Sequence, residues 1–198
     1  VSNYVYQAIE LIADVADALD VAHQHGIIHR DVKPGNLVFD RTANLILTDF
    51  GIAKTEGDIS ITRTGEFIGS PGYISPEQAM TRRVKVDHRS DIYSLGVTLY
   101  ELLTLEQPFL QDTLEATLRA ILTKDPVPPR KLNPKLPKDV ETVVLKAMEK
   151  DPDRRFLTAA EMAAKLRRIL NFEAIRVTPT SGLTKAWRMV QRNRTASL

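Results

Sequence analysis

At 198 residues the chain is long enough for one domain with a sizeable core, and its 43% hydrophobic and 26% charged residues are ordinary for a globular protein. The net charge of +2 does not indicate a polyanionic partner, so we expect no nucleic acid. Cysteine is absent, which excludes disulfides and thiolate metal sites. The sequence has neither an apolar run of about 18 residues, the length of a membrane span, nor the pattern of a signal peptide.

Residues 2–25 predict an amphipathic helix, because apolar side chains recur at steps of three and four at Val5, Ile9, Ile12, Ala16 and Leu19. Gly26 stands where a left-handed helix C-cap is expected. We interpret His23 and His25 as the polar end of this helix, since no metal-ligating residues lie near them in the sequence. The chain begins at Val1 rather than Met, directly in helical sequence, so we expect a longer parent protein.

Polar residues gather in two short loops, each beside an apolar run. Residues 29–36 (HRDVKPGN) precede the apolar residues 37–39, and residues 49–51 (DFG) follow the apolar residues 45–47. Two carboxylates, a lysine and an asparagine on loops between strands can handle a phosphate-bound metal. Either Asp alone would fit a loop cap on a solvated surface, but the full set favours a catalytic site.

The pattern H-R-D-x-x-x-x-N followed by D-F-G is the catalytic half of the protein-kinase signature set. The chain therefore resembles the C-terminal lobe of a bacterial serine/threonine protein kinase of the eukaryotic-like (Hanks) type. The resemblance implies an α+β fold that is mainly α, with a helical bundle around a buried central helix and short β-hairpins that carry the catalytic loops. It places the kinase lobe at residues 1–172 and a basic linker at residues 173–198.

The resemblance assigns chemical roles to five residues. Asp31 would be the catalytic base that accepts the proton of the substrate hydroxyl as this attacks the γ-phosphate. Lys33 would contact ATP and neutralise charge on the transferred phosphoryl group. Asn36 and Asp49 would bind ATP through Mg²⁺, with Mn²⁺ as the alternative metal. Val38 would form the floor beneath the adenine ring, although a buried strand valine fits its position equally well.

Residues 55–70 interrupt any regular period and are a candidate gate beside the site. The resemblance implies that Arg30 pairs with a phosphate on this stretch, carried by Thr62 or Thr64. Both threonines are favoured equally, since a phosphate would bring about two negative charges to the arginine and order the segment. Ordinary loop threonines are the alternative.

Two further pairs are implied to hold the lobe together. His29 would pack against Phe50 and take no part in proton transfer. Glu77, in a Ser-Pro-Glu version of the A-P-E motif, needs a cationic partner if it is buried, and the resemblance gives Arg155 as that partner.

Residues 69–77 (GSPGYISPE) resemble the loop on which a kinase docks its substrate. Ser70 stands where the family has Thr or Ser and would bond toward Lys33 and Asp31. A lysine two residues after the catalytic Asp is also typical of serine/threonine kinases. Both features favour serine and threonine hydroxyls of proteins as phosphate acceptors.

Residues 89–105 predict a helix that is buried on all sides, because apolar residues occupy nearly every face. Gly96 in its middle costs roughly 1 kcal/mol of helix propensity and indicates close packing against a neighbour. Asp91 is either an N-terminal cap or, as the resemblance implies, a hydrogen-bond acceptor for the catalytic-loop backbone, and the two roles are compatible.

The remaining helices are interpreted as scaffold. Residues 112–122 and 139–150 predict helices, and the prolines in residues 126–137 predict a non-helical loop between them. Thr158 and Glu161 form the sequence pattern of a capping box that opens a last helix.

Residues 174–198 contain several arginines, one tryptophan at position 187 and no acidic residue. The likeness to receptor-like kinases implies a juxtamembrane segment that contacts the membrane, which would put the protein in the cytoplasm or on the cytoplasmic face of the membrane. A flexible basic chain end is the alternative.

A whole kinase also needs a G-x-G-x-x-G loop, a strand lysine and a helix glutamate, and these patterns are absent from the sequence, so we expect the N-terminal lobe to be missing. The first hypothesis is a fragment of an active serine/threonine kinase, with ATP and protein substrates as partners and a kinase dimer as a candidate assembly. The second is a catalytically silent, kinase-like binding module. A small-molecule phosphotransferase is disfavoured, because the threonine-bearing loop and the Ser-Pro-Glu motif belong to kinases that act on proteins.

Overall fold

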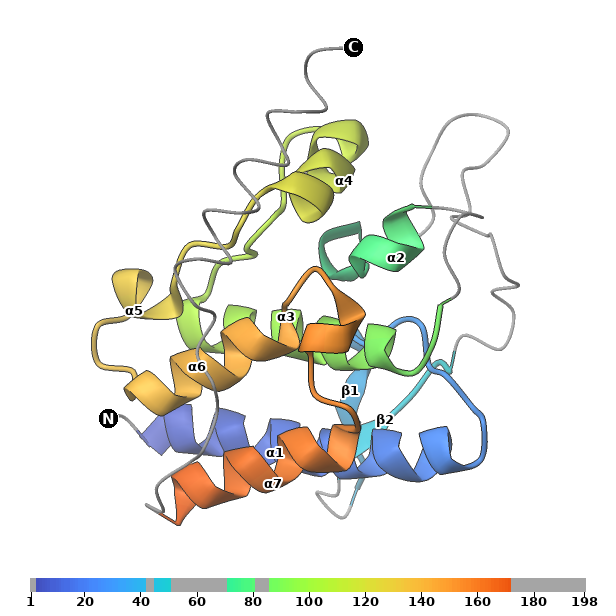
Figure 1. Cartoon of the computed structure of the whole chain (residues 1–198). Coiled ribbons are helices and arrows are strands. Elements are labelled where there is room, and N and C mark those ends of the chain that lie inside the picture. The colour runs from blue at the N-terminus through green and yellow to red at the C-terminus, as the bar shows by residue number, and fades with distance from the viewer. Residues whose placement is uncertain (1–2, 42–44, 51–70, 81–85, 172–198) are drawn as a thin grey trace.

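The structure is a computed structural model that describes residues 3–41, 45–50, 71–80 and 86–171 (Figure 1). The α-helices are α1 (Asn3–Gln24), α2 (Pro76–Ala79), α3 (Arg89–Thr104), α4 (Leu114–Thr123), α5 (Pro129–Leu132), α6 (Lys138–Ala147) and α7 (Ala159–Leu170). The short 3₁₀ turns are η1 (Pro34–Asn36), η2 (Pro71–Tyr73) and η3 (Pro152–Arg154), and the strands are β1 (Leu37–Phe39) and β2 (Leu45–Leu47). The fold is therefore mainly helical with a small sheet, as the resemblance implied.

Helix α3 is the element around which the others pack. Its residues 90–100 are buried without interruption, and it contacts α1, α5, α6 and α7. Two side-chain hydroxyl groups of this helix donate to carbonyl groups one turn earlier, Ser94 Oγ to Ser90 at 3.1 Å and Thr98 Oγ1 to Ser94 at 2.9 Å. The prediction of a central helix buried on all sides is confirmed.

Gly96 explains how α6 approaches α3 so closely. A Cβ atom at Gly96 would lie 2.7 Å from the Cβ of Ala147 and 3.2 Å from the Cγ of Met148. These distances are shorter than the van der Waals contact that carbon atoms need. The packing function that the sequence suggested for this glycine is therefore present.

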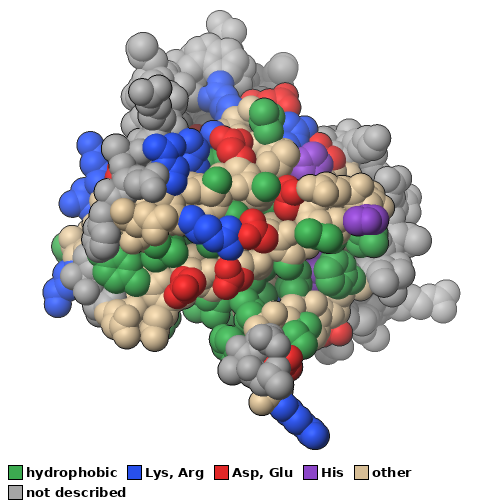
Figure 2. All heavy atoms as spheres, turned by 90° about the horizontal axis from the view of Figure 1, so that it is seen from below, with side chains coloured by type: hydrophobic (Ala, Val, Ile, Leu, Met, Phe, Trp, Pro, Cys, Tyr) green, Lys and Arg blue, Asp and Glu red, His purple; other side chains and the backbone are tan. Residues whose placement is uncertain are grey.

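Helices α1 and α7 lie side by side and run in opposite directions along the lower part of the molecule (Figure 1). Arg167 on α7 bridges two carboxylates of α1, at 2.9 Å from Asp14 and 2.6 Å from Asp17. Viewed from below, Figure 2 shows acidic and basic side chains next to one another on this face.

Among the described residues, no helix combines the length and apolar character needed to cross a membrane.

The two strands form an antiparallel hairpin that carries the catalytic loops. Leu37 pairs with Leu47, Val38 with Ile46 and Phe39 with Leu45. Leu37, Leu45 and Leu47 pack against the helical core, and β2 contacts α1. The hairpin therefore fixes residues 36 and 48, where the polar loops meet it, against the helices.

Two local predictions were wrong. The proline-rich stretch contains the one-turn helix α5, because Pro129 occupies its first position, where a missing N–H costs no hydrogen bond. Thr158 does cap α7 through the Glu161 amide, but the Glu161 carboxylate accepts from Leu157 rather than from Thr158.

Candidate active site

The side chains of Asp31, Lys33 and Asn36 converge in the loop between α1 and β1. Lys33 Nζ lies 3.0 Å from Asp31 Oδ2, and the amide nitrogen of Asn36 donates to the Asp31 carbonyl at 2.8 Å and to its carboxylate at 3.3 Å. The turn η1 makes this possible. Pro34 is its first residue, and the backbone amide of Asn36 donates a hydrogen bond to the Lys33 carbonyl at 3.0 Å. A base, a cation and an amide predicted from spacing are thus gathered at one point.

Asp49 is brought to this loop by the hairpin. The backbone amide of Thr48 donates to the Asn36 carbonyl at 2.9 Å, and Asp49 follows in a left-handed conformation with φ 59° and an exposed side chain. Since the Asn36 amide nitrogen bonds to Asp31, its amide oxygen is the atom left for a metal ligand. Among the described residues no group of three or more His, Cys, Asp or Glu side chains could hold a metal. An amide oxygen and one carboxylate nevertheless fit Mg²⁺, which prefers oxygen donors and keeps waters and phosphates as its other ligands.

Asp91 holds the backbone of the catalytic loop from inside the molecule. This carboxylate is fully buried, and it accepts hydrogen bonds from the His29 amide at 2.8 Å and the Arg30 amide at 2.7 Å. Arg30 has φ 66°, a left-handed conformation that a non-glycine residue adopts only when its surroundings impose it. The N-cap of α3 is His88, so of the two roles predicted for Asp91 the structure shows the contact with the loop.

His29 joins the two catalytic loops. Its Nε2 lies 2.9 Å from the Thr48 carbonyl and its Nδ1 accepts from the Asp31 amide at 3.3 Å, which together define the neutral tautomer protonated at Nε2. Its ring packs on Phe50 with 4.5 Å between centroids. Because both ring nitrogens are engaged by backbone, the geometry supports a structural role without proton transfer.

The interpretation of His23 as a polar residue at the end of the first helix was wrong. Its side chain is only 6% exposed, and Nε2 lies 2.8 Å from Asp91 Oδ2, so it adds a third contact to the loop anchor. His25 is exposed at the polar end of the helix, as expected. The available signal was spacing, because His23 lies four residues after Leu19 and so continues the buried face of α1.

Val38 and its cross-strand partner Ile46 form a small apolar surface on the hairpin. Val38 is 41% exposed and Ile46 is 42% exposed. The alternative that Val38 is a buried strand valine is therefore wrong. An exposed apolar strand residue two positions after Asn36 is compatible with the floor of an adenine pocket.

Glu77 and Arg155 form the predicted clamp. Both side chains are buried, and the guanidinium binds the carboxylate in two places, with Nη1 2.6 Å from Oε1 and Nη2 2.7 Å from Oε2. The hydroxyl of Ser90 donates to the same carboxylate at 2.5 Å. The other three N–H groups of the guanidinium donate to the carbonyls of Glu149, Arg89 and Lys150. All five donors of the buried cation are thereby satisfied.

The charge state of Glu77 follows from these contacts. Burial alone would raise the pKa of its carboxyl group, but the hydrogen bonds and charge of Arg155, together with the Ser90 hydroxyl, hold that pKa below its ordinary value. The carboxylate therefore stays ionised, and the clamp is an ion pair rather than a neutral hydrogen bond.

Gln78 links the docking loop to the catalytic loop, a contact that sequence reasoning missed. Its side-chain amide donates to the Arg30 carbonyl at 3.1 Å and accepts from the Ser75 amide at 3.1 Å. Ser75 caps α2 in return, which completes a capping box. The Ser-x-x-Gln spacing could have indicated the cap, although not the bond to Arg30.

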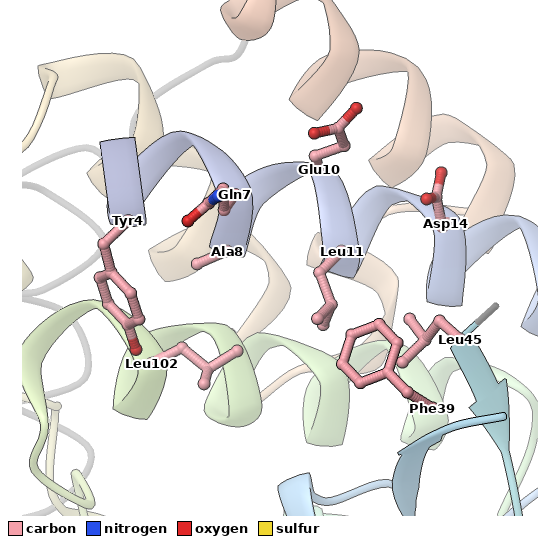
Figure 3. Close-up of a pocket in the computed structure, with 9 residues that line it drawn as sticks. All are labelled: Tyr4, Gln7, Ala8, Glu10, Leu11, Asp14, Phe39, Leu45 and Leu102. Atoms are coloured by element: carbon pink, nitrogen blue, oxygen red, sulfur yellow. The ribbon is translucent and has the colours of Figure 1, made fainter. Parts of the chain in front are cut away.

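A separate hollow of about 670 Å³ lies between α1, α3 and the hairpin (Figure 3). Its lining residues are Tyr4, Gln7, Ala8, Glu10, Leu11, Asp14, Phe39, Leu45 and Leu102. Leu11, Phe39 and Leu45 turn toward one another, whereas Glu10 and Asp14 point away from this apolar group (Figure 3). None of the lining residues belongs to the loop of residues 29–36, so the hollow is distinct from the site formed by Asp31, Lys33 and Asn36.

Three predicted residues lie outside the described part of the chain. Thr62 and Thr64, the candidate phosphorylation sites, and Ser70 of the docking loop fall in residues 51–70. Their roles stay predictions.

The fold and the loop geometry define a class of protein. The catalytic loop, the second aspartate behind a hairpin and the buried central helix coincide with a match to the protein kinase domain family over residues 4–166. The match covers more than half of the chain, and the chain belongs to this family.

The relatives that it resembles are bacterial. It is 48% identical over 165 residues to the serine/threonine-protein kinase PknB of Mycolicibacterium smegmatis, an alignment that covers 82% of this chain and 26% of that protein. The corresponding kinase of Mycobacterium tuberculosis is 48% identical over 169 residues, covering 84% of this chain and 27% of the relative. A probable serine/threonine-protein kinase of Streptomyces coelicolor is 37% identical over 182 residues, which are 91% of this chain and 27% of that protein. The chain thus spans about a quarter of the length of these curated relatives.

Proposed function

We propose that the protein carrying this chain transfers the γ-phosphoryl group of ATP to serine and threonine hydroxyls of proteins, with release of ADP. The observation that supports this most directly is the contact of Asp31 with Lys33 and Asn36, on a loop whose Asn36 carbonyl accepts hydrogen bonds from the backbone amide and the hydroxyl of Thr48, the residue before Asp49. The relatives named above are serine/threonine-protein kinases, and their names support the same class of acceptor.

The residues of the site would divide the work as follows. Asp31 accepts the proton of the attacking hydroxyl, and its hydrogen bond to Asn36 keeps the carboxylate oriented. Lys33, held 3.0 Å from Asp31, places a cation where negative charge develops on the phosphoryl group. Asn36 and Asp49 would hold a divalent cation, which supplies charge neutralisation to the ATP phosphates when it is bound.

The proposal is tested by a transfer assay with the complete gene product, labelled ATP and a peptide that contains serine and threonine. Asp31→Asn is expected to lower the rate by about 10²- to 10⁴-fold, the range that a general base contributes. Asp112→Asn, at an exposed aspartate outside the site, is the matched control and should leave the rate unchanged. Transfer that is independent of Asp31 would overturn the assignment, and absence of transfer in the unmodified protein would favour the silent binding module.

The 198-residue chain by itself is expected to show little or no Asp31-dependent transfer, because its sequence contains no G-x-G-x-x-G loop to cover the phosphates. Substantial activity from this chain would contradict that prediction.

Phosphorylation at Thr62 or Thr64, paired with Arg30, is the proposed means by which residues 55–70 are ordered. Mass spectrometry of the incubated gene product, with and without Thr62→Ala and Thr64→Ala, tests it.

Residues 173–198 are part of the proposal as a basic linker next to a membrane surface, with the protein in the cytoplasm or on the cytoplasmic face of the membrane. Sedimentation with vesicles containing anionic lipid should be strong for the full chain and weak for one ending at residue 172. Equal sedimentation of both chains would contradict a membrane role for the linker.

A further inference from the structure

Gln107 lies between the end of α3 and the docking loop. Helix α3 ends at Thr104, and its C-cap residue Leu105 has a left-handed conformation with φ 61°. The side-chain nitrogen of Gln107 then donates to the Tyr73 hydroxyl at 2.7 Å and to Glu101 Oε1 at 3.1 Å. The Tyr73 hydroxyl donates to Glu101 Oε2 at 2.5 Å, which closes a ring of three side chains. Both N–H groups of the amide and the phenol O–H are used, so the ring is fully paired.

The amide oxygen of Gln107 faces the backbone of the docking loop. A Cβ atom at Gly72 would lie 2.6 Å from this oxygen, so the glutamine fills the space next to the glycine. On the other side, Ser94 Oγ donates to the Tyr73 carbonyl at 2.8 Å. Residues 72 and 73 are therefore held through the phenol, through the carbonyl and by direct packing.

The phenol remains a donor over the physiological range. Burial, the hydrogen bond to Glu101 and the charge of that carboxylate all raise the pKa of Tyr73, and the contact with Gln107 lowers it by less. Glu101 in turn has both oxygens occupied by this ring. Gln107 is thus the member that joins the phenol and the carboxylate to a segment outside α3 and η2.

We propose that Gln107 is a positioning residue that fixes the backbone of Gly72 and Tyr73 against α3 and thereby sets the affinity of the docking loop for a protein substrate. The inference rests on the proposed function, because residues 71–77 meet a protein substrate only if the protein phosphorylates proteins as proposed. A docking loop ordered before binding loses less conformational entropy when a peptide binds, so loosening it should weaken binding more than catalysis. Gln107 itself need not touch the substrate.

The first test measures hydrogen exchange in the 198-residue chain. Gln107→Met keeps the length of the side chain and removes both donated hydrogen bonds, and Gln111→Met, at an exposed glutamine, is the matched control. The Ile74 amide, which donates to the Pro71 carbonyl at 3.3 Å, should lose protection about tenfold in Gln107→Met, as expected for one to two net hydrogen bonds. Protection within α3 should be unchanged in both variants.

Gln107→Glu supplies a readout that packing alone would not change. Near pH 7.5 the introduced carboxylate faces Glu101, and two like charges at this distance repel, so protection of Ile74 should fall. Near pH 5 the introduced carboxyl group is protonated more readily, because the neighbouring carboxylate raises its pKa, so the repulsion weakens and protection should return toward the unmodified value. Unchanged protection in both Gln107 variants, or an equal loss at both pH values in Gln107→Glu, would overturn the proposal. If Gln107→Met fails to fold, the pH dependence of Ile74 protection in Gln107→Glu still tests the proposal.

The second test measures kinetics in the complete gene product. Gln107→Met should raise KM for the acceptor peptide about fivefold to tenfold and change kcat less than about twofold. An unchanged KM would contradict the role in substrate affinity. If the unmodified gene product transfers no phosphate, the proposed function fails, while the exchange measurement still reports on the loop by itself.

Discussion

Two sets of charged side chains in this molecule have opposite surroundings. Asp91 and Glu77 are buried, and each accepts three or more hydrogen bonds from backbone amides or side chains. Asp31 and its partner Lys33 keep 22% and 20% of their side chains exposed. The buried set fixes the path of the chain, whereas the exposed set is accessible to a substrate. The difference assigns stability to the buried carboxylates and leaves Asp31 and Lys33 for the proposed chemistry.

The strongest test of the buried set is Arg155→Ala. Removing the guanidinium leaves the Glu77 carboxylate buried without its cation, which typically costs about 3–5 kcal/mol. Denaturant unfolding followed by circular dichroism would measure the loss. Arg154→Ala, at an exposed arginine that pairs with Asp151 at 3.5 Å, should change the free energy of unfolding by less than about 1 kcal/mol. Equal stability of the Arg155 variant and the unmodified chain would contradict the clamp.

The same clamp predicts an acid sensitivity. The pKa of Glu77 is lowered by folding, so its stabilisation is complete above the unfolded value of 4.5 and disappears as the pH falls through the lower folded value. Glu77→Gln removes this titration and should flatten the fall of unfolding free energy as the pH drops below the unfolded value of 4.5. If the unfolding free energies of the unmodified protein and of Glu77→Gln fall equally steeply with pH, the lowered pKa of Glu77 is contradicted.

Asp91→Asn tests the anchor of the catalytic loop. The substitution replaces a charged acceptor by an amide that can turn an N–H toward the His29 and Arg30 amides, so we expect a loss of about 2–3 kcal/mol. Amide exchange at residues 29 and 30 should also become faster. Asp139→Asn, at an exposed position of α6, is the control and should leave both quantities unchanged. Unaltered exchange at the loop would show that Asp91 is not its anchor.

The two glycines Gly96 and Gly35 extend the comparison to packing. Gly96→Ala forces a Cβ against Ala147 and should cost roughly 1–3 kcal/mol. Gly35 lies in the catalytic loop, where an added Cβ meets nothing within 4 Å, and Gly35→Ala should change stability by less than about 0.5 kcal/mol. Thermal unfolding of both variants checks the contrast, and a larger loss at Gly35 would reverse it.

Sequence patterns predicted the parts that local spacing controls. The loop of residues 29–36 and the burial of α3 follow from short motifs and periodicity, and the structure contains both. The contacts that were missed join distant segments: His23 meets Asp91 across 68 positions, and Gln78 meets Arg30 across 48. No local pattern encodes such a meeting, because it depends on how helices pack. α5 was missed for a different reason, since one proline at a first turn permits the helix that a proline cluster argues against.

We propose that Asp31 is required for phosphoryl transfer and contributes little to the stability of the fold. Its direct test is the phosphoryl-transfer rate of Asp31→Asn in the complete gene product, measured together with the free energy of unfolding. We predict a rate at least about 100-fold lower, with stability changed by less than about 1 kcal/mol because the lost ion pair with Lys33 is partly exposed. A variant that retains transfer, or one that loses activity only because it unfolds, would contradict the account.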